Sequence, residues 1–222
     1  MQTLEEWLTA APRAGRKTST SSRSMSFVVI TGGIGTGKST VLAAFAKLGA
    51  HCLDTDEAAH ALYAPGGPAL QPIAEHFGDA VRLPDGTLDR KAVAARVFRD
   101  PAELAWLNAL LHPMIRERMC AEAARVAPAP LFVAVPLWYE VGWTLPEVRV
   151  VATWCSEEQQ LRRLRQRGWD DAEIESRIHS QLSRDEKLNR ADFGVLTIGS
   201  MKLLQEQCRR IYGQLVKQED SA

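Results

Sequence analysis

A glycine-rich stretch, TGGIGTGKST at residues 31–40, contains the residues whose types and spacing most clearly indicate a chemistry. Gly32, Gly37, Lys38 and Ser39 match the spacing G-x-x-x-x-G-K-[ST], which forms a phosphate-binding loop when a strand precedes it and a helix follows. Glycines let the backbone N–H groups approach an anion closely, and the N-terminus of the next helix adds its positive end. The stretch therefore predicts a nucleoside triphosphate site.

Each part of this loop has an expected role. Lys38 is expected to reach the β- and γ-phosphates. The Ser39 hydroxyl is expected to bind Mg²⁺, which bridges these phosphates and neutralises charge as a phosphoryl group departs. Thr40 adds a hydroxyl near the α-phosphate. The predicted nucleotide-binding residues of the loop are Gly32, Gly33, Ile34, Gly35, Thr36, Gly37, Lys38, Ser39 and Thr40.

Two carboxylates, Asp54 and Asp56, stand at the end of a second predicted strand, residues 51–54. In an extended segment, side chains two residues apart point the same way, and ligands of open α/β sheets bind beyond the carboxyl ends of the strands. Both carboxylates are therefore expected to serve the site. Alternatively, one of them is only the N-cap of a helix predicted over residues 57–63.

Arg163 and Arg167 are one helical turn apart in a basic segment at residues 157–184. Their spacing puts both guanidinium groups on one helix face, where they can bind phosphate oxygens and offset transition-state charge. The alternative is a solvent-exposed face paired with nearby acidic residues. A break at residues 168–171 predicts a helix, a turn and a second helix, which could swing as a lid.

His112 lies beside Pro113 in a long helix that is predicted to start at Pro101. A histidine in such a place is more often a packed or capping residue than a functional one, and the proline is expected to interrupt or kink the helix. Apolar residues recur at helical spacing along this segment, which makes it chiefly a core face. They are Leu104, Leu107, Leu111, Ile115 and Met119.

Five short apolar runs alternate with helical segments and predict strands. They are residues 27–30, 51–54, 131–135, 148–154 and 192–198. Strands that alternate with helices favour an α/β fold, and right-handed crossovers then give a doubly wound parallel sheet with the phosphate loop at a central strand. P-loop proteins often hold Mg²⁺ through an acidic residue at the end of such a strand. The third run ends in Ala134 and Val135, so any acidic group that assists Mg²⁺ binding must be Asp54, Asp56 or Glu140.

Composition limits the kind of protein that this is. Lys and Arg total 27, as do Asp and Glu, so the protein has no net positive charge that would attract nucleic acid or an anionic membrane. No apolar run approaches the ~20 residues that span a bilayer, and the four cysteines include no C-x-x-C pair, which favours a soluble protein of the reducing cytoplasm. Residues 1–24 are mostly polar and small, and are expected to be a disordered extension without a secretory signal.

The motifs between residues 27 and 212 together resemble one family, the dephospho-coenzyme A kinases. The stretches that carry the likeness are TGGIGTGKST, LDTDEAAHALY, LNALLHPMI, VPLWYE, CSEEQQLRRLRQR and RIHSQLSRDEKLNRAD. The resemblance implies transfer of the ATP γ-phosphoryl to the ribose 3′-hydroxyl of dephospho-CoA. It also implies a P-loop kinase domain, residues 25–217, with a helical CoA-binding region at about 65–130 and a lid at about 157–190.

Carried over by position, the resemblance gives several residues a role. Asp56 becomes the general base or the orienter of the 3′-hydroxyl, and Lys38 and Arg163 stabilise the transferring phosphoryl group. Arg163 and Arg167 match lid arginines that bind ATP. Residues matched to the acceptor side are Asp54, Asp56, His112 and Lys187.

At residue 197 the chain departs from the family pattern, which has an asparagine where this chain has Thr197. The detailed contacts near the adenine or the lid hinge are therefore left open, whereas the phosphate chemistry is unaffected. Two other functions fit the loop by itself: another small-molecule kinase, such as a nucleoside or nucleoside-monophosphate kinase, and a non-catalytic nucleotide switch. The chain lacks an Asn-Lys-x-Asp element for reading guanine, and a pure scaffold would have no use for the lid arginines.

Overall fold

The computed structural model describes residues 26–97, 99–145 and 147–217. The extension predicted at residues 1–24 lies outside this part of the chain. The described residues form two compact units, one of residues 54–122 and the other of the remainder. Within the described residues, no helix is both long and apolar enough to cross a membrane.

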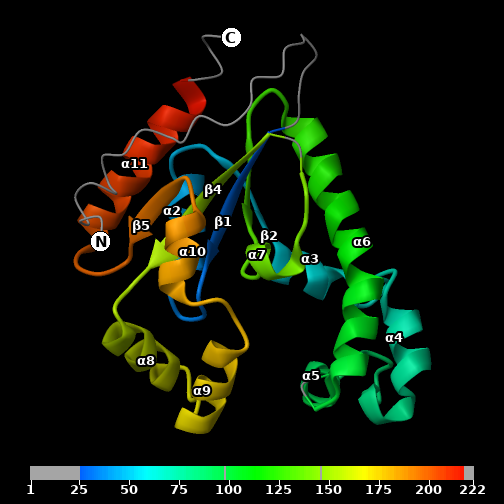
Figure 1. Ribbon diagram of the computed structural model, residues 1–222. Coiled ribbons are helices and arrows are strands. Elements are labelled where there is room, and N and C mark those ends of the chain that lie inside the picture. Colours follow the sequence, from blue (N-terminus) through cyan, green and yellow to red (C-terminus); the bar gives the residue numbers. More distant parts are fainter. Residues whose placement is uncertain (1–25, 98, 146, 218–222) are drawn as a thin grey trace. The chain divides into compact units, whose positions relative to one another are not determined.

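The larger unit is built on a five-stranded parallel sheet, as predicted (Figure 1). Its strand order is β2-β3-β1-β4-β5, which puts the strand before the phosphate loop at the centre. β1 pairs in parallel with β3 and with β4, and β4 pairs in parallel with β5. The strands are β1 (Phe27–Gly32), β2 (His51–Asp54), β3 (Leu131–Ala134), β4 (Val148–Trp154) and β5 (Phe193–Leu196).

The central strand β1 is buried along its whole length, because helices cover the sheet. Val28 and Ile30 pack in one apolar cluster with α2 (Lys38–Ala46) and α11 (Met201–Lys217). The helix α10 (Arg184–Arg190) contacts β4 and β1 and lies in front of the strands in Figure 1. A strand buried on both faces is typical of a doubly wound sheet.

Shorter helices complete this unit. The four-residue α7 (Trp138–Val141) follows β3, and α8 (Glu157–Gln166) and α9 (Asp171–His179) follow β4. Between α8 and α9, Gly168 has a φ of +83°, which ends α8 at the predicted break because glycine adopts this left-handed conformation without strain.

The unit of residues 54–122 is mostly helical. It contains α3 (Thr55–Leu62), α4 (Leu70–Phe77), the 3₁₀ turn η1 (Asp79–Val81), α5 (Arg90–Val97) and most of α6 (Pro101–Val126). Arg82 and Leu88 form an antiparallel bridge between η1 and α5. The His76 ring stacks on Trp106 with centroids 3.6 Å apart, and this stack joins α4 to α6.

The structure corrects one local prediction in this unit, and a second proline lies within a helix. α6 continues through Pro113 instead of being interrupted there, since a helix can lose the one hydrogen bond that proline cannot donate. Leu111 and Met119 are buried on its core face, whereas Leu104 is 38% exposed. α4 begins at Leu70 and includes Pro72, because proline is tolerated in the first turn of a helix.

Candidate active site

The phosphate loop joins β1 to α2, and its backbone has the conformation that the glycine pattern predicts. Gly37 is the N-cap of α2 with a φ of +94°, and no side chain caps this helix end. A Cβ on Gly32 would lie 2.2 Å from the Thr153 hydroxyl oxygen, so only glycine fits there. The first N–H groups of α2 are thus left without a side-chain cap, as an anion site requires.

Lys38 is held at the start of the loop. Its ammonium donates to the carbonyl oxygens of Gly32 and Gly33, each at 3.0 Å. The Thr36 hydroxyl donates to the same Gly33 oxygen at 2.7 Å. These bonds put the lysine charge beside Gly33, at the end of the loop where a P-loop lysine meets the β- and γ-phosphates.

Side chains from distant segments bind the next three carbonyl groups of the loop. The Gln160 amide donates to Ile34 O at 2.6 Å, Arg163 donates to Gly35 O at 3.3 Å, and the Thr197 hydroxyl donates to Thr36 O at 2.7 Å. These bonds fix the carbonyl groups of the loop and so its backbone conformation, in which N–H groups can approach an anion. Gln160 was not among the site residues predicted from the sequence.

A cavity of about 330 Å³ opens beside the second half of the loop. Arg163 and Arg167 both line it, which confirms that the structure brings these two arginines to the phosphate loop. The cavity extends over the link from β5 to α11, and its lining residues are Gly35, Gly37, Ser39, Thr40, Arg163, Gln166, Arg167, Thr197, Ile198, Gly199, Ser200, Met201 and Leu204. Its position next to the loop suits the base and ribose of a nucleotide.

Arg163 is fixed at this cavity by Thr197. One of its terminal nitrogens donates to the Thr197 hydroxyl oxygen at 2.9 Å, and the other donates to the Thr197 carbonyl oxygen. Thr197 is the residue at which the chain departs from the family pattern, and that departure was the one signal in the sequence that pointed to it. The threonine joins Arg163 to the loop, because its hydroxyl also donates to Thr36 O.

α8 forms one side of the phosphate site. Gln160 and Leu164 are 3% and 0% exposed, and a Cβ on Gly35 would lie 3.1 Å from Leu164 Cγ. With Arg163, these side chains tie one face of α8 to the loop. A movement of α8 as part of the predicted lid, residues 157–190, would therefore break these contacts with the loop.

Lys187 is fully buried in α10. Its ammonium lies 2.8 Å from a Glu140 carboxylate oxygen and donates to Pro136 O at 2.8 Å. Burial lowers the pKa of this lysine, and the hydrogen bond and charge of Glu140 oppose the shift. The structure thus places Lys187 in an internal ion pair next to the end of β3, and its assignment to substrate binding stays a prediction.

Asp54 and Asp56 lie at the start of the helical unit. The strand ends at Asp54, whose carboxylate caps α3 by accepting a hydrogen bond from the Asp56 N–H at 2.9 Å. Asp56 is in the first helical turn, so the prediction that both residues share one extended segment is wrong. The physical reason is the capping bond, which shows that Asp54 is the N-cap of α3, and its assignment to substrate binding stays a prediction.

His112 lies in the same unit, within α6. Its ring is partly buried, and burial lowers the pKa of the imidazole. This shift favours the neutral form of the ring near neutral pH. Like Asp56, His112 keeps its role on the acceptor side as a prediction.

This chain is similar to known proteins over most of its length. The family model for dephospho-CoA kinase matches residues 26–202. A dephospho-CoA kinase from Anaeromyxobacter dehalogenans is 44% identical over 195 residues, which cover 86% of this chain and 92% of that protein. One from Idiomarina loihiensis is 39% identical over 190 residues, which cover 85% and 94%.

Solved structures agree with these matches. A protein from Thermus thermophilus superposes with a TM-score of 0.72 at 30% identity, over 86% of this chain and 99% of its own. A dephospho-CoA kinase from Campylobacter jejuni superposes with a TM-score of 0.63 at 26% identity, over 86% and 98%.

Proposed function

The chain belongs to the dephospho-CoA kinase family, whose reaction is the final step of coenzyme A synthesis, and we propose which of its residues perform that reaction. The γ-phosphoryl group of ATP passes to the ribose 3′-hydroxyl of dephospho-CoA, which gives CoA and ADP. In-line phosphoryl transfer depends mainly on positioning and electrostatics. The observation that supports the assignment most is the phosphate loop, since its backbone and Lys38 are arranged to bind phosphates.

We assign the ATP side to the loop and the cavity beside it. Lys38, at Gly32 and Gly33, binds the β- and γ-phosphates. Arg163 and Arg167, which line the cavity, bind the rest of the nucleotide, and charge on Arg163 also favours the transition state. Gln160 and Leu164, which are both buried, hold α8 and its arginines against the loop.

On the acceptor side, we assign Asp56 the role of general base or orienter of the 3′-hydroxyl. Asp56 is exposed in the first turn of α3, whereas Asp54 is occupied as the cap of that helix. Asp54 therefore acts by holding the start of α3, and so Asp56, in place. His112 completes the predicted acceptor side as a neutral hydrogen-bonding group.

Mg²⁺ is the metal that this chemistry implies, and the donor set of the loop fits it. Ser39 is exposed at the second position of α2 and lines the cavity. Mg²⁺ prefers oxygen ligands and commonly binds through substrate phosphates and waters with few protein groups. Ser39, with its exposed hydroxyl at the loop, is therefore our assigned protein ligand. When bound, the ion neutralises charge on the phosphates.

We place the enzyme in the cytoplasm, where free thiols persist. The four cysteines are all free. Burial raises the pKa of the Cys52 thiol to about 11 and that of Cys208 to about 12. These thiols are packing groups, and thiolate chemistry has no part in the proposed reaction.

The direct test is ADP release from ATP and Mg²⁺, measured with and without dephospho-CoA. The expected result is slow release without the acceptor and a large increase with it, together with a product that is heavier than dephospho-CoA by one phosphoryl group. Nucleosides and nucleoside monophosphates serve as competing acceptors in the same assay. Equal release with and without dephospho-CoA, or faster phosphorylation of a nucleoside, would overturn the proposal.

A further inference from the structure

Different basic side chains lie at the two ends of the phosphate loop. Lys38 is bonded at Gly32 and Gly33, the end where a P-loop lysine meets the β- and γ-phosphates. Arg163 is bonded at Gly35 and is held by Thr197 beside the cavity. Arg163 therefore stands at the base end of the nucleotide site, and the terminal phosphate needs a second partner beside Lys38.

Arg184, the first residue of α10, lies at the Lys38 end. Its Cβ is 3.6 Å from the position that a Cβ on Gly33 would take. One terminal nitrogen donates to the Gln160 side-chain oxygen at 2.8 Å, and the Gln160 amide nitrogen in turn donates to Ile34 O. The Arg184 side chain thus runs along the loop at residues 33 and 34.

The charge of Arg184 is poorly compensated there. Its side chain is 18% exposed, and its Nε is buried without a hydrogen-bond partner among the described residues. Gln160 is neutral. Glu157, the acidic neighbour, is 70% exposed at 3.5 Å, and a pair of that kind contributes little.

A buried donor on a cation is costly to leave unpaired. An oxyanion bound at the loop would pair with this donor and with the guanidinium charge together. Gln160 has both of its amide atoms engaged, so it fixes the guanidinium in place and does not itself bind the ligand.

We propose that Arg184 is a further phosphate-binding residue, which donates from its guanidinium to the γ-phosphoryl group of bound ATP at the Lys38 end of the loop. The proposal rests on the assignment of the loop as the ATP site. Arg163 then serves chiefly the nucleotide at the cavity, and the terminal phosphate is bound by Lys38 and Arg184 from the two sides of Gly33.

The test compares ligands with and without a γ-phosphate. Binding of ADP and of an ATP analogue with an imido bridge between the β- and γ-phosphates is measured by calorimetry on the full chain, with Mg²⁺ and without an acceptor. Arg184→Met is expected to weaken binding of the analogue by about 10- to 100-fold, as for loss of a hydrogen bond to a charged group, and to leave ADP binding nearly unchanged. Arg184→Lys keeps the charge and is expected to recover part of the difference.

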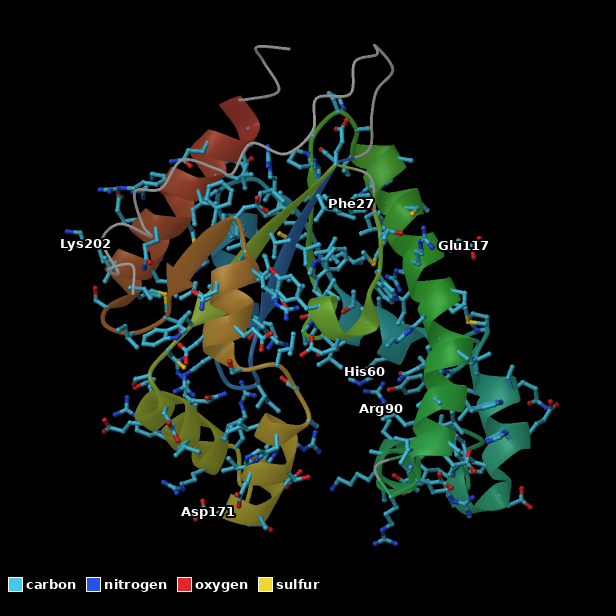
Figure 2. All side chains as sticks on the ribbon, in the orientation of Figure 1. Phe27, His60, Arg90, Glu117, Asp171 and Lys202 are labelled. Atoms are coloured by element: carbon cyan, nitrogen blue, oxygen red, sulfur yellow. The ribbon has the colours of Figure 1, made fainter. Side chains whose placement is uncertain are left out.

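The matched control is Arg165→Met. Arg165 is on α8, is 57% exposed and pairs with Asp171, which lies at the start of α9 (Figure 2). This variant is expected to bind both ligands like the wild type. Equal weakening of ADP and the analogue by Arg184→Met would mean that Arg184 only shapes the loop, and would overturn the proposal, as would unchanged binding of both.

These readouts separate the proposal from the assigned function. Nucleotide binding is measured without dephospho-CoA, so a wrong acceptor would leave the comparison intact. If wild-type protein bound neither ligand, the assignment of the loop as the ATP site would fail first. The thermal midpoint of each variant is recorded, and Arg184→Lys provides the comparison if Arg184→Met does not fold.

Discussion

The phosphate loop and the helical unit of residues 54–122 specify their chemistry in different ways. In the loop, nine consecutive residues are predicted to bind the nucleotide, and partners far along the chain, such as Gln160 and Thr197, bind its carbonyl groups. In the helical unit, Asp56 and His112 come from separate helices, and each belongs to a stretch that is typical of the family but names no chemistry by itself. Phosphate is bound largely by backbone N–H groups, so a glycine pattern in the sequence can predict the site. Recognition of the acceptor substrate depends on side chains from separate segments, which no single pattern predicts.

The largest expected effect is on the loop itself. Lys38→Ala is expected to reduce turnover by about 10³-fold or more, in the range seen when a charge-stabilising donor of a transition state is lost. ADP release in the presence of dephospho-CoA measures it. Lys47→Ala, at the exposed C-cap of the same helix, is the control and is expected to behave like the wild type.

The Lys38 prediction also probes the contrast between the two regions. Binding of dephospho-CoA to Lys38→Ala, followed by calorimetry, is expected to stay close to that of the wild type. If turnover persisted, the loop would not be the phosphate site. If acceptor binding vanished as well, the two regions would not act as separate halves.

The corresponding change in the helical unit is Asp56→Asn. Loss of a general base is expected to reduce turnover by about 10²- to 10⁴-fold, with ATP binding unchanged because the loop is untouched. Initial rates at saturating ATP and dephospho-CoA measure it. Glu57→Gln, the exposed neighbour in the same helical turn, should retain activity. A wild-type rate for Asp56→Asn would show that Asp56 is neither the general base nor the orienter of the hydroxyl, and that it has only a structural place in the first turn of α3.

Much of the fold could be predicted from the sequence because its signals are local. The apolar runs that became β1 to β5 and the loop glycines act over a few residues each, and the structure has the five strands in the expected places. The start of α3 was harder, since an extended segment and a capped helix share the sequence Asp-Thr-Asp. The capping bond from Asp56 N–H to Asp54 decides between them.

Gln160, which the sequence did not indicate, and Thr197, whose contacts the sequence left open, both act through contacts between distant residues. Gln160 lies 126 residues from Ile34, its bonding partner in the loop. Thr197 lies 161 residues from Thr36. Neither has a residue type that suggests a role by itself, and the fold alone brings them to the carbonyl groups that need donors.

A change at Lys187 tests whether its buried ion pair with Glu140 stabilises the larger unit. Lys187→Met leaves Glu140 without its cationic partner, although the Leu182 N–H still donates to it, and is expected to lower the free energy of unfolding by about 3 kcal/mol, as for other broken buried pairs. Urea denaturation measures it. The double variant Glu140→Gln, Lys187→Met is expected to be more stable than Lys187→Met.

The control for Lys187 is Lys202→Met. Lys202 is exposed on α11 and points away from the molecule (Figure 2), so its loss is expected to leave stability unchanged. A drop in affinity for dephospho-CoA without loss of stability in Lys187→Met would instead favour the predicted substrate-binding role.

Thr197 tests the long-range contacts of the loop. Thr197→Val keeps the shape beside Gly37 but removes the hydroxyl that bonds Arg163 and Thr36 O. With each lost bond contributing about 1 kcal/mol, the KM for ATP is expected to rise about 5- to 30-fold with a smaller change in kcat. Thr197→Ser keeps the hydroxyl and is expected to stay near the wild type. Equal kinetics for the two variants would show that the threonine contributes shape alone.

The smallest expected effect concerns pH and the helical unit. Burial lowers the pKa of His112 below its ordinary value of 6.5, so the unfolded chain binds more protons than the folded one in that range. The contribution of His112 to stability is therefore fully present above pH 6.5 and is lost as the pH falls toward the lowered pKa. Urea denaturation between pH 5 and 7.5 is expected to show a weaker decline for His112→Gln than for the wild type. His51→Gln changes an exposed histidine outside this unit and is expected to follow the wild-type profile. If His112→Gln followed it too, the histidine would be no more buried in solution than an exposed one, and its place on the acceptor side would need another argument.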